Sequence, residues 1–335
     1  MIINIGDLSQ SLQTRRDTGT TKSELVRLTG ELSSGVSGDL VSRLNGDFGP
    51  LASIERGLSR VESFQSTNAE FELFVSTQQA TIGYLRELGS ISNVFLAIPE
   101  TGDNTLIVNA GTDALSRFDA AIDNLNIQIA GRSVFSGVET NRPALASAET
   151  ILLALETEIA TAGAATAADV SAVVETWFAV GGGYDTVGYT GGPAPTTAVQ
   201  LSDTEAVTAE VTAENDAIRD QLRFLSLGAL LGRNLLSGDI VEQGALARMA
   251  GEGLNASDDR LIAVQSSLGS VEASVERARV EVGIEADNLR TTKAELIEVD
   301  PFNVAVELQN AETRLQSIYA ITARLSRLSL VEYLR

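Results

Sequence analysis

Histidine and cysteine are both absent from the 335-residue sequence. Their absence excludes Ser-His-Asp and Cys-His nucleophilic sites, thiolate chemistry, disulfides and the usual zinc ligands. Carboxylates, lysines, hydroxyls and bound Mg²⁺ or Ca²⁺ could still support catalysis, but the commonest general base is missing. We therefore predict that the chain is not an enzyme and that it holds neither a cofactor nor a metal ion.

Basic residues are few, with 24 Lys and Arg against 45 Asp and Glu, which gives a formal net charge of −21. Such a surface repels phosphate backbones and anionic lipids, so we predict no nucleic-acid partner and no membrane partner. Arg233 and Asn234 interrupt the best apolar run, which falls short of the ~20 residues that cross a bilayer. The N-terminus carries Asp7 before any basic residue and is not a cleavable secretory signal. Taken alone, this indicates the cytoplasm.

Aromatic residues make up only 5% of the chain, and its apolar residues are mainly Leu, Val, Ile and Ala. This composition favours long helices with narrow seams over a broad globular core. Apolar residues at three- and four-residue steps predict helices over residues 4–32, from 51 to just before Pro99, and over 106–129, with Gly131 ending the third. Turn residues predict an irregular connection over 33–50.

The strongest pattern lies near the C-terminus, where a three-four alternation of apolar residues predicts a coiled-coil helix over residues 257–299. Asp300 and Pro301 supply an N-cap carboxylate and a first-turn proline, so a further helix is expected to begin there and to run almost to the chain end. Such helices must pack on others, either in an intramolecular bundle or in a polymer, and the pattern alone admits both.

The middle of the chain, residues 138–212, is rich in Ala, Thr, Gly and Pro. We expect short helices near 150–160 and 168–178, strands and turns around 184–211, and then a helix over 214–231. The predicted fold class is mainly α, an elongated bundle of long helices or coiled coil from both termini with a small inserted α+β or β-rich domain. The predicted domains are 1–137 as the N-terminal helical part of the rod, 138–212 as the inserted outer domain and 213–335 as the C-terminal helical part.

Two adjacent carboxylates, Asp258 and Asp259, could form a catalytic pair or a Ca²⁺ site. We favour a plain structural interpretation, in which Ser257 is the N-cap of the long helix and both acids lie at its positive end.

Two features of the inserted region also admit a functional interpretation. The three glycines at 181–183 could form a phosphate loop, but no Lys-Ser or Lys-Thr follows them, and we favour a plain turn. Trp177 and Phe178 could form an exposed recognition patch, but a small domain needs a core, so we expect both to be buried.

Three stretches of the sequence resemble the flagellin family. They are Glu31 to Gly35 at the end of the first helix, Gly131 to Gly137 after the third, and the terminal run from Asp300. Within that family, the second stretch, the ending at 328–334 and the small insert are more similar to the hook–filament junction proteins, the third hook-associated proteins, than to filament flagellins. Residues 36–39 depart from the family pattern.

This resemblance implies a structural subunit of the bacterial flagellum that joins hook to filament through coiled-coil packing of its terminal helices. It also implies an extracellular location, with export unfolded through the flagellar secretion channel and no cleaved signal, which replaces the cytoplasmic interpretation. The implied partners are copies of the chain itself, neighbouring hook-associated protein and flagellin subunits, and a flagellar export chaperone. Filament flagellin and a non-flagellar coiled-coil binding module remain the alternatives.

We place the assembly interface on the two terminal helices. The first is marginal alone, because residues 18–21 are poor helix formers, and burial against other copies would stabilise it. Arg324 and Arg327 flank the seam and either pair with acids of a neighbour or are solvated. The predicted interface residues are Leu8, Leu12, Leu25, Leu28, Leu32, Leu308, Leu315, Ile318, Leu325, Leu328, Tyr333 and Leu334.

Overall fold

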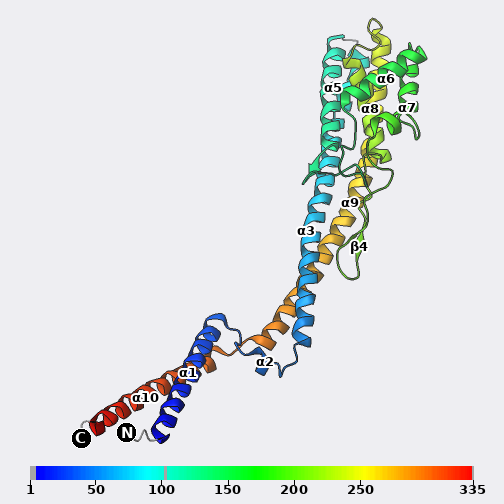
Figure 1. Cartoon of the computed structure of the whole chain (residues 1–335). Coiled ribbons are helices and arrows are strands. Elements are labelled where there is room, and N and C mark those ends of the chain that lie inside the picture. The colour runs from blue at the N-terminus through cyan, green and yellow to red at the C-terminus, as the bar shows by residue number, and fades with distance from the viewer. Residues whose placement is uncertain (1–4, 102–103, 334–335) are drawn as a thin grey trace. The chain divides into compact units, whose positions relative to one another are not determined.

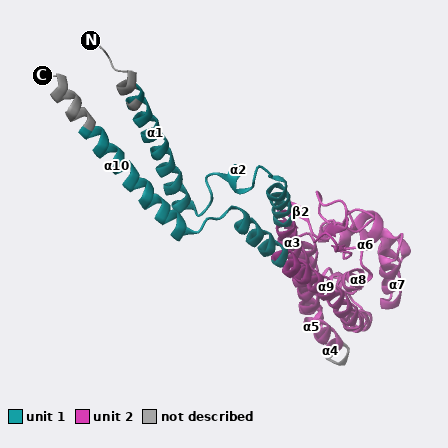
Figure 2. Cartoon of the chain, turned by 90° about the horizontal axis from the view of Figure 1, so that it is seen from below, with its two compact units in different colours: residues 1–62, 284–335 teal, residues 63–283 magenta. Residues whose placement is uncertain are grey.

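The computed structural model describes residues 5–101 and 104–333. Its contacts divide the chain into two units, residues 1–62 with 284–335 (unit 1) and residues 63–283 (unit 2), which Figure 2 colours teal and magenta. The predicted mainly α class is confirmed, since the described chain consists of long helices with a few two-residue strands. No described helix is both long and apolar enough to span a membrane.

Unit 1 is built around a pair of terminal helices. Its elements are α1 (Ile5–Ser34), α2 (Leu40–Arg43), the beginning of α3 (Gly49–Gly89), the end of α9 (Ile240–Ile297) and α10 (Pro301–Tyr333). Helices α1 and α10 lie side by side in both views (Figures 1 and 2). Glu24 pairs with Arg314 at 3.5 Å, and Lys22 Nζ lies 5.8 Å from the centre of the Tyr319 ring. Earlier residues of α1 thus face later residues of α10, so the two helices are antiparallel.

In unit 2 the helices α3 and α9 also run antiparallel. Glu72 pairs with Arg279 at 3.3 Å, Gln79 Nε2 donates to the carbonyl of Gln265 at 2.9 Å, and Arg86 pairs with Asp258 at 2.7 Å. Helix α9 begins at Ile240, well before the predicted start at 257. The interpretation of Ser257 as an N-cap is therefore wrong. Ser257 lies within α9, and its hydroxyl shares hydrogen bonds with Oε1 of Gln221 and the carbonyl of Leu254.

The second predicted helix is wrong in its extent, because α3 ends at Gly89 and α4 (Ser92–Thr101) continues through Pro99. Side chains from other helices satisfy the last carbonyls of α3. Arg117 Nη1 donates to the carbonyl of Leu88 at 3.1 Å, and Gln221 Nε2 donates to that of Leu85 at 2.9 Å. For the Leu88 carbonyl, the Arg117 guanidinium replaces the bond that a continuing helix would supply, so α3 can end there.

The third predicted helix also ends early. Helix α5 (Asn104–Leu125) is followed by an antiparallel hairpin of β1 (Gln128–Ile129) and β2 (Arg132–Ser133). Ala130 and Gly131 form its turn with φ values of 50° and 77°, the positive values that a two-residue primed turn requires. Gly131 therefore closes a hairpin and does not terminate a helix.

Helices α5 and α8 (Asp216–Gly232) pack closely in unit 2. Gly111 lies against Gly232, and a methyl group on Gly111 would come within 2.5 Å of the Gly232 backbone nitrogen. Glycine at both positions lets the two backbones approach.

The compositionally distinct residues 138–212 form short elements within unit 2. They are α6 (Ala148–Ala162), α7 (Ala167–Phe178), the π-helix η1 (Tyr184–Gly188), β3 (Val199–Gln200) and β4 (Ala206–Val207). Trp177 and Phe178 are 5% and 2% exposed and pack with Tyr184, which confirms that they are core residues. Gly181 and Gly182 lie in a turn, where Gly181 has a φ of 79°, whereas Gly183 is the N-cap of η1 and lies under the Trp177 ring.

Candidate assembly surface on the terminal helices

Helices α1 and α10 share only a small core among the described side chains. Leu28, Val304 and Ala311 are 0%, 5% and 2% exposed, and Leu25 and Leu308 pack against them. Each fully buried Leu or Val contributes about 1.5–3 kcal/mol, whereas fixing the backbone of one residue costs about 1–2 kcal/mol. This core is small for helices of 30 and 33 residues. The pair therefore gains little stability from its own contacts.

Large apolar side chains remain exposed along both terminal helices. Val26 is 75% exposed on α1, and Phe302 is 74% exposed in the first turn of α10. The others are Leu12, Leu32, Val306, Tyr319 and Ile321, each between 40% and 56% exposed. Single exposed apolar residues are ordinary, but so many on a weakly held helix pair indicate a surface that a partner covers.

The structure divides the predicted interface residues into groups. Leu28 is buried between the two helices, with Leu25, Leu308, Leu315 and Ile318 half-buried, while Leu12 and Leu32 face solvent. The remaining calls lie outside what the structure describes: Leu334 itself, and the side chains of Leu8, Leu325, Leu328 and Tyr333. The role of these residues in assembly stays a prediction.

Several residues of this surface were missed from the sequence. Thr21 and Glu31 on α1 are each 3% exposed. Thr21 lies one heptad before Leu28, so a heptad pattern that allows polar residues would have included Thr21. Glu31 Oε1 accepts bonds from Arg27 at 2.7 Å and from the backbone of Gly38 at 2.8 Å. Phe302 has no sequence signal of its own, because Asp300 and Pro301 before it predict only a helix start.

Charge separates the terminal helices from the rest of the chain. Helices α1 and α10 together hold seven basic and seven acidic residues, so the excess of acids lies in the residues between them. Like-charged proteins repel one another. The net charge of these two helices would therefore not oppose contact between copies through them.

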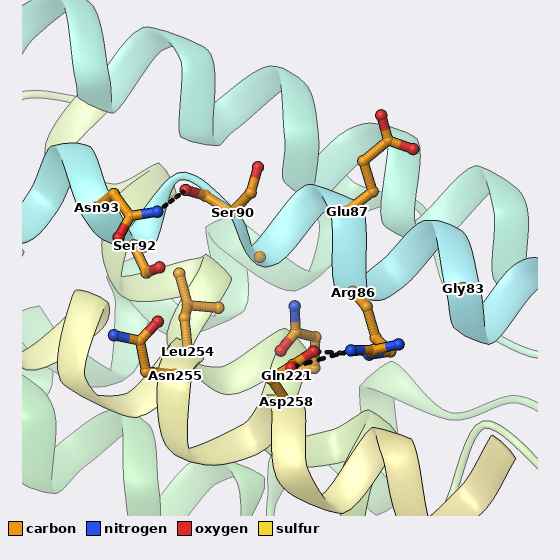
Figure 3. Close-up of a pocket in the computed structure, with 11 residues that line it drawn as sticks. Gly83, Arg86, Glu87, Ser90, Ser92, Asn93, Gln221, Leu254, Asn255 and Asp258 are labelled. Carbon is orange, nitrogen blue, oxygen red and sulfur yellow. Dashed lines mark hydrogen bonds and ion pairs between the residues drawn. The ribbon is translucent and has the colours of Figure 1, made fainter. Parts of the chain in front are cut away.

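Asp258, one of the two adjacent carboxylates of the sequence, lines a polar cleft in unit 2 (Figure 3). The cleft has a volume of about 530 Å³ and is lined by residues that include Arg86, Gln221, Asn255 and Asp258. Arg86 binds both carboxylate oxygens of Asp258, at 2.7 and 3.1 Å, and this hydrogen bonding raises the pKa of the guanidinium. Among the described residues, no three acidic side chains gather as metal ligands. Asp258 therefore joins α3 to α9.

The comparisons with known proteins agree with this architecture. A family model described as the bacterial flagellin C-terminal helical region matches residues 255–334. No curated protein matches the chain.

Two similar solved structures share the fold. One is a protein from Vibrio parahaemolyticus assigned as flagellar hook-associated, with 14% identity and a TM-score of 0.51, covering 73% of this chain and 95% of that chain. The other is FlgL from Bacillus cereus, with 14% identity and a TM-score of 0.51, covering 72% of this chain and 100% of that one. Residues 255–334 thus match the C-terminal helical region of bacterial flagellins, and the chain shares its fold with these two structures.

Proposed function

We propose that this chain is a non-catalytic structural subunit of the bacterial flagellum that joins the hook to the filament. The observation that carries the proposal is the exposed apolar surface of α1 and α10, which share only a small core of their own. The similar solved structures support it, because they are described as a flagellar hook-associated protein and as FlgL.

In this function the terminal helices of neighbouring copies bury one another's apolar side chains. Each Leu, Val, Ile or Phe that becomes buried contributes about 1.5–3 kcal/mol, so several per neighbour offset the cost of ordering and association. Assembly would also extend the small core around Leu28. We infer that the terminal helices gain most of their stability in the polymer.

Residues 138–212 are proposed to form an inserted outer domain, with residues 1–137 and 213–335 as the two helical parts. The inserted residues hold ten acids and only one basic residue, Arg142. A strongly acidic surface stays solvated and resists self-association. This supports a solvated, outer position for these residues in the assembled structure.

The wider setting follows from the flagellar assignment. We propose that the subunit is exported through the flagellar secretion channel to the cell exterior, that neighbouring hook-associated and flagellin subunits contact it, and that an export chaperone binds it before export. Filament flagellin is the alternative function. Purified flagellin would grow long filaments from seeds, whereas a junction subunit stops as a short layer on hooks.

Exposed residues of the terminal helices offer the test. Leu12→Asp and Ile321→Asp each introduce a charge at a position whose side chain is 50% or 56% exposed, respectively. The control is Val180→Asp, in the turn that follows α7, where the side chain is 86% exposed. We expect both terminal variants to lose binding to purified hooks and the control to bind normally. The single tryptophan, Trp177, reports by its fluorescence whether unit 2 stays folded. Normal binding of both terminal variants would refute the proposal.

A further inference from the structure

Two chain connections meet at the base of the terminal helices in unit 1. Residues 35–48 follow α1, and residues 298–300 precede α10. The backbone N–H of Ser37 donates to the carbonyl of Ile297 at 2.8 Å, and that of Val299 donates to the carbonyl of Gly35 at 2.9 Å. These bonds make Val36 and Glu298 an isolated antiparallel bridge. Segments about 260 residues apart in sequence are thus joined by backbone pairing.

Arg43 also binds the segment that precedes α10. Its Nε donates to the carbonyl of Leu296 at 2.7 Å and its Nη2 to that of Glu295 at 3.2 Å. These carbonyls belong to the last turn of α9, where helical partners run out. A guanidinium there satisfies both carbonyls and also favours the negative end of the helix dipole.

The ends of both terminal helices are fixed to this bridge by local bonds. Gly35 follows α1 with a φ of 73°, the left-handed conformation that ends many helices. On the other strand Asp300 Oδ1 accepts the backbone N–H of Phe302 at 2.9 Å and so caps α10. The bridge therefore lies between the end of α1 at Ser34 and the start of α10 at Pro301, within three residues of each.

We propose that residues 35–37, residues 297–299 and Arg43 form a clasp that stays closed while the terminal helices dock, and that Arg43 is the residue that holds it. This rests on the proposed function. The bridge keeps the adjoining ends of α1 and α10 together, so both helices enter the assembly as one tied pair. A chain without the clasp could dock one helix and leave the other free.

An engineered disulfide tests whether the clasp stays closed. Val36 and Glu298 are the non-hydrogen-bonded pair of the bridge, a geometry with Cα atoms about 4.5 Å apart, within the range of disulfides. The chain has no cysteine, so Val36→Cys with Glu298→Cys gives one bond in the full-length protein. We expect the purified variant to oxidise readily and to bind hooks equally well, within twofold, when oxidised and when reduced. Binding only when reduced would show that the clasp must open, and would overturn the proposal.

Hydrogen exchange on the unassembled chain tests the role of Arg43. We expect the amides of Ser37 and Val299 to be protected and Arg43→Gln to speed their exchange by about tenfold, since a net hydrogen bond is worth roughly that factor. Arg56→Gln is the matched control, because the Arg56 guanidinium donates within its own helix, to the carbonyl of Ala52 at 3.2 Å. Unprotected amides in the parent chain, or equal effects of the two variants, would overturn the clasp. If the parent chain fails to bind hooks, the proposed function falls, and the clasp is judged by this exchange alone.

Discussion

The hydroxyl of Ser257 on α9 donates a hydrogen bond to the side-chain carbonyl of Gln221 on α8. The amide of Gln221 in turn donates to the carbonyl of Leu85, at 2.9 Å, near the end of α3. Gln221 is 1% exposed, and it borders the polar cleft of Figure 3. One buried amide thus joins three helices of unit 2.

Replacing Gln221 should destabilise unit 2. In Gln221→Ala the carbonyl of Leu85 loses its side-chain donor and the Ser257 hydroxyl keeps only the carbonyl of Leu254, and loss of a buried partner costs about 1–3 kcal/mol. We expect a lower urea midpoint, followed by Trp177 fluorescence. Gln128→Ala, at an exposed position of the same unit, should leave the midpoint unchanged. Equal midpoints for Gln221→Ala and the parent chain would contradict this account.

A second prediction concerns the contact of α5 with α8. Gly111→Ala adds a methyl group where the backbone of Gly232 already lies, so the helices must separate. Overpacking of this kind costs about 1–3 kcal/mol, and we expect a lower thermal midpoint by calorimetry.

The matched control for Gly111 is Gly269→Ala in α9. The nearest atom to a methyl group there, on Gln79, is 3.7 Å away, which is ordinary contact. Alanine is the better helix former, so this variant should be as stable as the parent chain or slightly more stable. Destabilisation by both alanines would show that close approach to Gly232 is not the cause.

Two buried tyrosines predict that unit 2 loses stability in alkali. Burial raises the pKa of Tyr189 to about 12, with the charge of Glu214 adding to the effect, and burial raises the pKa of Tyr184 further. In the unfolded chain both ionise near a pKa of about 10. The folded state therefore binds these protons more tightly, and its stability is fully present below about pH 10 and falls as the pH rises through that value. Urea midpoints from pH 8 to 11 should show the fall, and Tyr189→Phe should reduce it. A midpoint that rises over this range would contradict the assignment.

The distribution of charge predicts that salt promotes assembly. The residues between α1 and α10 carry the excess negative charge, and the screening length shrinks from about 30 Å at 0.01 M salt to about 8 Å at 0.15 M. We expect the concentration of chain needed for half-maximal binding to hooks to fall several-fold over this range. Weaker binding at higher salt would instead indicate that ion pairs hold the copies together.

Helix periodicity predicted most of the long elements, because their apolar stripes are continuous. Helix α1 holds even through its threonine-rich part, where the hydroxyl of Thr18 bonds back to the carbonyl of Thr14 at 2.7 Å. Helix α9 begins before the predicted start, although Gly251 and Gly253 are residues that disfavour a helix. In the structure they admit Leu96 and Phe224, which is a requirement of packing. Local sequence does not distinguish these two uses of glycine.

The candidate site was predictable only in part. A heptad stripe looks the same whether its partner is in the same chain or in another copy, so Leu28 and Leu12 could not be told apart by sequence. The structure places the first inside the pair and leaves the second in solvent. The clasp had no sequence signal, since backbone pairing between residues 36 and 298 leaves no pattern of side chains, and the sequence does not show which carbonyls Arg43 binds.

The approach of Gly111 to Gly232 also limits how this chain can diverge. A side chain at either position would collide with the backbone of the other glycine. A substitution at one position therefore requires the two helices to move apart. Relatives should therefore keep glycine at both places or lose it at both. We expect the two positions to covary among chains that retain this packing of α5 on α8, so that the pair would mark the packing in a sequence.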